Sequence, residues 1–426
     1  MTSFAIQSIV GRRVWDSRGR PTVEAEVTLS DGSMGRAIAP AGASKGKREA
    51  LELRDGGASF GGLDVLKAVS HINSEIARTL IGAHADNQSN IDQRLIELDG
   101  THNKSRLGAN ATLAVSMATA YAMASCCNMP LYRYLSPDSV GRIPMPQIQI
   151  FGGGAHAGKR VDIQDFMIVC PGAKTFAQAL EWTAEVYRHA GLLMTQRGSL
   201  FGVADEGGWW PDFTSNEQAL QMLVKSIESA GFIPGQQVAI ALDIAASEFG
   251  QNGIYRLGLE SRQLDSDGLI EMLVGWINKY PIVSIEDPLA EDDPQGFARF
   301  TKAMGHRLQI VGDDFLVSDA KLIREAAKLG AANSVLLKPN QRGTLTETLE
   351  AWTTAKELGY AAIASARSGE TEDTTIVDLA IGWNVGQLKV GSFARSERMA
   401  KWNHALRIEE HLGLHAGFAG GSVFNR

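Results

Sequence analysis

The first 60 residues alternate apolar and polar side chains, as in the stretch Thr22–Leu29, and this two-residue period predicts β-strands. An Asp31–Gly32 pair follows that stretch and is typical of a hairpin turn. From Gly62 to about Leu135 the apolar spacing becomes helical, and residues 110–124 are rich in alanine. We therefore expect an α+β domain over residues 1–135, built on a small antiparallel sheet.

A second domain is expected over residues 136–426. Its first residues, 136–146, have the proline and glycine content of a connector. Short apolar runs then alternate with longer helical patterns, which predicts a parallel sheet with crossover helices. The runs are FMIVC, VAIALDIA, PIVSIEDP, LQIVGDDF, SVLLKP, AAIASA and QLKVGS. A doubly wound sheet and a closed barrel both fit this α/β alternation, and seven visible strands with one missed favour the eight-fold barrel.

Composition narrows the class of function. The 426 residues include 41 Lys+Arg and 48 Asp+Glu, so the net charge of -7 gives no basic surplus for nucleic-acid binding. The chain lacks a secretory signal at its first residues and an apolar run of membrane-spanning length. Three cysteines cannot form a framework of several disulfides, which suits a reducing compartment. We expect a cytoplasmic protein that binds neither nucleic acid nor membrane.

Polar residues end most of the apolar runs of the second domain. They are Asp243, Glu286, Asp313, Lys338, Arg367, Ser368 and Lys389. In a barrel the carboxyl ends of the strands meet at one face, so these side chains can surround a single ligand. Three carboxylates without cysteine or a strand-end histidine form an oxygen-donor set that suits Mg²⁺ better than Zn²⁺. Any one acid is more commonly a helix cap or turn residue, but their coincidence at strand ends argues for a site.

Two lysines finish strands where a barrel is partly desolvated. There a lysine loses its proton more readily and can act as a base, while a second, charged lysine can hold a substrate carboxylate. Three other motifs are weaker. The glycine-rich loop 39–46, the acids Asp205 and Glu206 before two glycines, and His156 in a glycine-rich stretch could each be structural.

Several stretches, taken in order, resemble the enolase family across nearly the whole chain. They are DSRGRPTVEAEV from Asp16, REALELRDG from Arg48, LDGTHNKSRLGAN from Leu98, VDIQDFM from Val161, ADEGG from Ala204, PIVSIEDP from Pro281, VGDD from Val311, RSGETED from Arg367 and KWNHALRIEE from Lys401. The resemblance implies an N-terminal α+β domain and a modified eight-fold α/β barrel, usually in a homodimer. It also implies a Mg²⁺-dependent lyase that dehydrates a small phosphorylated carboxylate, with two Mg²⁺ per site.

The resemblance implies a role for each matching residue. Asp243, Glu286 and Asp313 match the ligands of one Mg²⁺, and Ser44 matches the ligand of a second. Lys338 matches the base that removes the α-proton, Glu206 the acid that protonates the leaving hydroxyl, and Lys389 the group that neutralises the substrate carboxylate. The pairing of a lysine base with Mg²⁺ is a known feature of this superfamily and follows here from the resemblance alone. Arg367 and Ser368 match the phosphate-binding pair, and His156 matches a loop histidine that contacts substrate.

Some positions depart from the family pattern where it touches substrate. Ala366 replaces a histidine, Lys45 a threonine and Asp165 a glutamate, while Gly152, Ala155 and Arg342 also differ. The lost side-chain volume, together with charge from Lys45 and Arg342, suits a bulkier or more anionic substrate than 2-phosphoglycerate. The alternatives are an enzyme like carboxyphosphonoenolpyruvate synthase of phosphonate biosynthesis, drift in an ordinary enolase, and a non-catalytic binding protein that keeps the fold.

Overall fold

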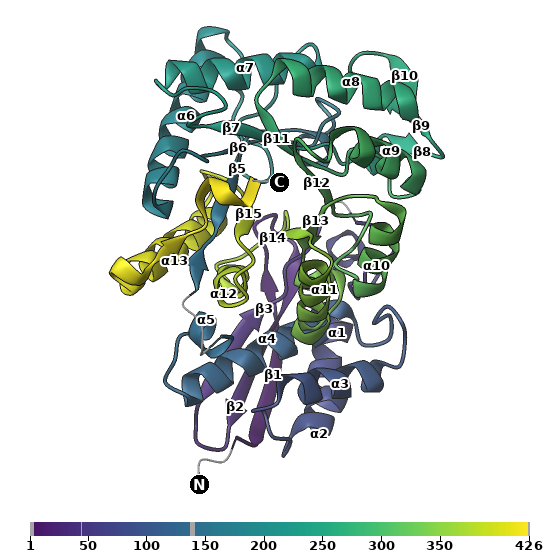
Figure 1. The fold of residues 1–426 in the computed structure, drawn as a ribbon. Coiled ribbons are helices and arrows are strands. Elements are labelled where there is room, and N and C mark those ends of the chain that lie inside the picture. Colours follow the sequence, from purple (N-terminus) through teal and green to yellow (C-terminus); the bar gives the residue numbers. More distant parts are fainter. Residues whose placement is uncertain (1–3, 44, 137–140, 425–426) are drawn as a thin grey trace.

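The computed structural model describes residues 4–43, 45–136 and 141–424, which form an N-terminal α+β part and a closed α/β barrel (Figure 1). The fold class predicted from the sequence is confirmed. No helix among these residues combines the length and the apolarity that crossing a membrane requires.

The N-terminal part contains the expected antiparallel sheet, in the order β1-β2-β3. Its strands are β1 (Ile6–Trp15), β2 (Pro21–Leu29) and β3 (Met34–Ile38). The Asp31–Gly32 turn joins β2 to β3, as the sequence predicts. The helices that follow are α1 (Leu66–His71), α2 (Ala77–Leu80), α3 (Gln88–Asp99), α4 (Ala109–Cys126) and α5 (Leu131–Tyr134), with a π-helical turn at Ile72–Ile76 between α1 and α2.

Helix α4 lies between this sheet and the barrel (Figure 1). Its alanine-rich sequence has no polar face, and 15 of its 18 residues are buried. Small residues allow close packing: a Cβ atom on Gly35 of β3 would lie 2.1 Å from the backbone nitrogen of Ala122. On the barrel side, the Thr112 hydroxyl donates to the Gly343 carbonyl at 2.8 Å. The helix therefore fixes the N-terminal sheet against the barrel's loops.

The barrel closes in the order β11-β12-β13-β14-β15-β5-β6-β7. Its strands are β5 (Met145–Gly152), β6 (Asp165–Val169), β7 (Ala239–Asp243), β11 (Ile282–Glu286), β12 (Gln309–Gly312), β13 (Ser334–Leu337), β14 (Ala361–Ser365) and β15 (Gln387–Ser392). The strand missed from the sequence is β5, whose first residues belong to the stretch interpreted as a connector. Pro146 and the glutamines at 147 and 149 hide its apolar character.

One strand differs from the parallel sheet that the sequence predicts. β6 runs antiparallel to both neighbours, β5 and β7. The connection from β5 to β6 carries a short 3-10 turn, Gly154–Ala157, and no crossover helix, so the chain reverses direction as in a hairpin. As a consequence, the first residue of β6 lies at the same rim as the last residues of the parallel strands.

Eight longer helices of the described chain surround the barrel. They are α6 (Phe176–Gln196), α7 (Asn216–Ser229), α8 (Ser266–Lys279), α9 (Pro294–Met304), α10 (Ala320–Leu329), α11 (Leu345–Glu357), α12 (Thr375–Gly382) and α13 (Ser396–Leu412). A peripheral sheet comprises β8 (Gly250–Gln251), β9 (Ile254–Leu257) and β10 (Arg262–Asp265), and β4 (Arg142–Ile143) pairs with β16 (Gly417–Phe418). In the barrel, Val311, Leu336 and Ile363 form a small apolar cluster.

Candidate active site

The polar residues at the strand ends meet at one rim of the barrel, as expected from the sequence. Asp243 ends β7 and Glu286 ends β11, while Asp313 and Lys338 directly follow β12 and β13. Asp165 reaches the same rim because β6 is antiparallel, and it is paired in register with Asp243.

A pocket of about 310 Å³, including its opening, occupies this rim. Its lining is His156, Gln164, Asp165, Glu206, Asp243, Lys338, Ser365, Ala366, Arg367, Ser368, Lys389, Val390 and Gly391. The lining includes three buried lysine and arginine side chains, namely Lys338, Arg367 and Lys389. Such a concentration of buried positive charge beside carboxylates suits an anionic ligand held with a metal cation.

Lys389 lies among three buried carboxylates. Its Nζ atom is 2.8 Å from Oδ2 of Asp243, 2.8 Å from Oε2 of Glu286 and 3.2 Å from Oδ2 of Asp165. Burial opposes the charge on Lys389, but Asp243, Glu286 and Asp165 raise its pKa well above the usual value. Burial and the nearby Asp243 raise the pKa of Glu286 well above its usual value. These three neighbouring carboxylates therefore need a positive charge between them, and their oxygen atoms are suitable ligands for a hard cation such as Mg²⁺.

Lys338 forms a second buried pair, in which its ammonium group donates to Oδ2 of Asp313. The other oxygen of Asp313 accepts from Nε2 of Gln341 at 2.9 Å. Burial alone would lower the pKa of Lys338, but the Asp313 carboxylate raises it. Burial alone would raise the pKa of Asp313, but Lys338 lowers it below its usual value. The structure thus differs from the sequence expectation that this lysine loses its proton readily, because an acid faces it.

His156 connects two acids that line the pocket, Asp165 and Glu206. Its Nδ1 lies 3.0 Å from Oδ1 of Asp165, and its Nε2 lies 3.4 Å from Oε1 of Glu206 and 3.1 Å from the Ser368 hydroxyl. Burial disfavours the imidazolium, yet Glu206 and Asp165 raise the pKa of His156 to about 9. Burial likewise opposes ionisation of Asp165, but His156 and Lys389 lower its pKa. His156, Asp165 and Glu206 are also close enough together to hold a cation.

Arg367 is fixed from both domains. Its Nη1 donates to Oε2 of Glu49 at 3.0 Å and to Oδ1 of Asn340 at 2.9 Å, while Nη2 donates to Oε1 of Glu49 at 3.2 Å. The buried Arg398 donates to the Arg367 carbonyl at 2.6 Å and to the Val390 carbonyl at 2.8 Å. Ser368 follows in the chain and also lines the pocket, so both residues border the same space.

Some residues singled out from the sequence lie elsewhere. Lys45 pairs with Glu52, and Arg342 lies 2.7 Å from Asp319, so neither lines the pocket. Ser44 falls outside the described residues. Gly152 is closely packed, because a Cβ there would lie 2.6 Å from the Cβ of Ala204.

The structure also adds residues that the sequence did not single out. Gln164 lines the pocket and donates to Oδ2 of Asp243 at 3.1 Å. Its place beside Asp165 was a signal that could have identified it. Glu49 lies in the stretch REALELRDG, but nothing in that stretch shows its partner, because it reaches Arg367 only through the packing of the two domains.

Comparisons with known proteins cover the full chain. The model of the enolase N-terminal domain matches residues 6–135, and that of the enolase C-terminal TIM barrel domain matches residues 141–426. Enolase 1 of Desulfitobacterium hafniense strain Y51 is 49% identical over 427 residues, which span 100% of this chain and 98% of the relative. The similarity therefore includes both the N-terminal part and the barrel rim.

Proposed function

This chain belongs to the enolase family of hydro-lyases, and from that premise we propose that it dehydrates 2-phosphoglycerate, or a close phosphono analogue, to the corresponding enolpyruvate. The observation that supports this most strongly is the convergence of Lys338 and Lys389 with Asp243, Glu286 and Asp313 at one rim. The reaction needs a base for the α-proton and compensation for the dianion that forms from the carboxylate. These groups supply both.

The metal ligands in this proposal are Asp243, Glu286 and Asp313, with Ser44 for a second Mg²⁺. Bound Mg²⁺ would supply Lewis-acid stabilisation of the substrate carboxylate. Lys389, which contacts Asp243 and Glu286, would bind the same substrate carboxylate through its ammonium group. Clustered carboxylate oxygens are the donor set that this cation prefers.

The proton transfers are assigned to two residues that line the pocket, Lys338 and Glu206. Lys338 removes the proton from C2, which requires that its ammonium group has first released its own proton and its contact with Asp313. Glu206 protonates the hydroxyl that leaves C3. His156 contacts both Glu206 and Asp165, so His156 and Asp165 position the Glu206 carboxyl group. Arg367 and Ser368 hold the phosphoryl group, for which the Arg367 guanidinium must exchange or share its contact with Glu49.

The carboxyphosphono substrate is the second candidate. Ala366 favours it, because the side chain that borders the pocket here is only a methyl group. However, Lys45 and Arg342, which were expected to add positive charge, are paired with acids outside the pocket. The buried acid, base and carboxylate set gives the non-catalytic alternative no support, and we favour 2-phosphoglycerate. By resemblance, the proposal includes a homodimer or larger homo-oligomer, and from its composition we propose that it is cytoplasmic.

Steady-state kinetics test this function. Purified protein with Mg²⁺ should convert 2-phosphoglycerate to phosphoenolpyruvate, followed by phosphorus NMR, and a chelator should abolish the conversion. The carboxyphosphono analogue in a parallel reaction identifies the preferred substrate. Absence of turnover with both compounds at saturating Mg²⁺ contradicts the proposal.

A further inference from the structure

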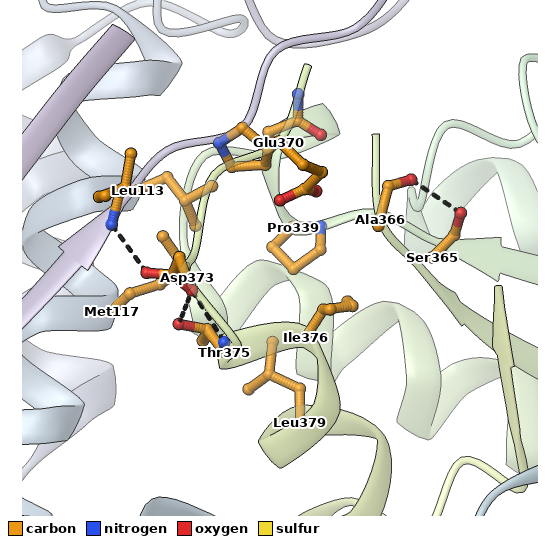
Figure 2. Close-up of a pocket in the computed structure, with 13 residues that line it drawn as sticks. Leu113, Met117, Pro339, Ser365, Ala366, Glu370, Asp373, Thr375, Ile376 and Leu379 are labelled. Carbon is orange, nitrogen blue, oxygen red and sulfur yellow. Dashed lines mark hydrogen bonds between the residues drawn. The ribbon is translucent and has the colours of Figure 1, made fainter. Parts of the chain in front are cut away.

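A second cavity lies between the N-terminal part and the barrel (Figure 2). The space in it that is open to the centre of a water-sized group is about 20 Å³, which is room for one small substituent. Its lining residues come from the end of β3 (Ile38), from α4 (Leu113 and Met117), from the Pro339–Asn340 turn and from α12 with the segment before it. Most of these side chains are apolar.

The cavity and the active-site pocket share two lining residues, Ser365 and Ala366. The Ser365 hydroxyl donates to the Ala366 carbonyl at 2.9 Å, as Figure 2 shows, so it is held within its own strand end. Ala366 contributes only a methyl group. Arg367 is the next residue, and its guanidinium donates to Asn340, which also lines the cavity. The cavity therefore lies beside the group that we assign to the phosphoryl oxygens.

The charges around the cavity disfavour an anion. Among the described residues, its lining contains no lysine or arginine, but it includes the carboxylates of Glu370 and Asp373. Glu370 lies 3.0 Å from Nζ of Lys401, and Asp373 accepts from the Ile38 amide at 2.9 Å. Figure 2 shows Asp373 hydrogen-bonded to Thr375 as well. Because both acids already have partners, the free surface offered to a ligand is mainly apolar.

We infer that this cavity is an accessory subsite that accepts a small uncharged group carried on the phosphorus of the substrate. The inference rests on the proposed function, in which Arg367 and Ser368 hold the phosphorus oxyanion. The elimination itself is unchanged: Lys338 takes the C2 proton, the C–H electron pair becomes the C2–C3 double bond, and the C3 hydroxyl leaves as water with a proton from Glu206. The group on phosphorus keeps all its bonds.

The test compares three compounds in the presence of Mg²⁺. They are 2-phosphoglycerate, an analogue with methyl in place of one phosphoryl oxygen, and an analogue with carboxylate at that position. The methyl analogue should exceed the carboxylate analogue in kcat/KM by about tenfold or more, because one apolar group placed in an apolar subsite changes kcat/KM by about 10- to 200-fold.

Variants with larger side chains in the cavity test whether the preference for the methyl analogue arises there. Leu113→Phe, from α4, and Ala366→Leu, from the shared wall, should each lower the ratio of the methyl analogue to 2-phosphoglycerate by about tenfold. Ala364→Val is the matched control, because Ala364 lies two residues before Ala366, in β14, but lines neither space, and this variant should keep the ratio. Thermal unfolding checks that each variant folds, and Met117→Phe replaces Leu113→Phe if that one does not.

Two results would overturn the subsite: a carboxylate analogue that is turned over as well as the methyl analogue, or filling variants that leave the ratio unchanged. If neither 2-phosphoglycerate nor either analogue is converted, the proposed function fails. Calorimetry then measures the affinities of the same three compounds. The subsite is judged by the same ratios, with affinity in place of kcat/KM.

Discussion

The Nζ atom of Lys389 lies 2.8 Å from Oδ2 of Asp243, although 146 residues separate the two in sequence. The barrel creates this contact by bringing the last residue of β7 and the middle of β15 to one rim. The same ammonium group also contacts Glu286. One lysine thus compensates two acids that we propose as metal ligands.

Lys389→Met should destabilise the fold, and bound Mg²⁺ should reduce this loss. Removing one partner from a buried ion pair destabilises a protein by about 3–5 kcal/mol, because the other charge is left uncompensated. Urea unfolding without metal should show a loss of this size, and saturating Mg²⁺ should recover part of it by compensating Asp243 and Glu286. Dehydration should remain lost in both cases. An equal loss of stability with and without Mg²⁺ would contradict the placement of the metal.

The stability of the fold should depend on the charge of His156. Its pKa is raised from an ordinary value of 6.5 to about 9, so the stabilisation is fully present below pH 6.5 and is lost as the pH rises through 9. The free energy of unfolding should therefore fall between these pH values, by an amount on the order of 3 kcal/mol. His156→Gln should flatten this part of the profile, measured by urea unfolding at several pH values. A profile that is the same in both proteins argues against a protonated His156.

Gly152 should tolerate no side chain unless its neighbour shrinks. A Cβ there would lie 2.6 Å from the Cβ of Ala204. Gly152→Ala should lower the free energy of unfolding by about 1–3 kcal/mol through overpacking, and Ala204→Gly in the same chain should restore part of it. A double-mutant cycle by urea unfolding measures the coupling. Additive effects of the two substitutions would show that the residues do not compete for space.

Lys45→Thr should change little. The Lys45 side chain is 46% exposed, pairs with Glu52 and lies outside the pocket lining. Glu52 is only 9% exposed, but it keeps its contact with Arg54 at 3.0 Å, so stability should fall by about 1 kcal/mol. KM for 2-phosphoglycerate should change by less than about threefold, because Lys45 does not line the pocket. Steady-state kinetics decide this, with Glu206→Gln as the inactive comparison. A large rise in KM would show that Lys45 turns toward the substrate during turnover.

The sequence predicted what depends on local pattern. Period-two alternation and the Asp31–Gly32 turn indicated the N-terminal sheet, and polar residues after apolar runs indicated the rim of the barrel, including Asp243 and Lys338. β5 was missed because Pro146 and neighbouring glutamines interrupt its apolar run. The direction of β6 depends on the connection before it, which residue pattern alone does not specify.

The charge state and neighbours of side chains were less predictable. The lysine base was expected to lose its proton easily through desolvation, but Asp313 faces Lys338 and raises its pKa. Glu49 contacts Arg367 from the other domain. The two residues are 318 positions apart in the sequence, and no local pattern indicates that they meet. Such pairings arise from packing between distant segments, and they decide the electrostatics of the site.

Exchange of the C2 proton of 2-phosphoglycerate in D₂O with Mg²⁺ tests the assignment of base and acid more directly than any other measurement. We expect that Glu206→Gln still exchanges this proton while its dehydration falls by about 10²- to 10⁴-fold, because the base is intact and only the acid is lost. Lys338→Ala should lose both reactions. Proton NMR measures exchange and product together. Exchange that persists in Lys338→Ala, or disappears in Glu206→Gln with Lys338 intact, would contradict the assignment.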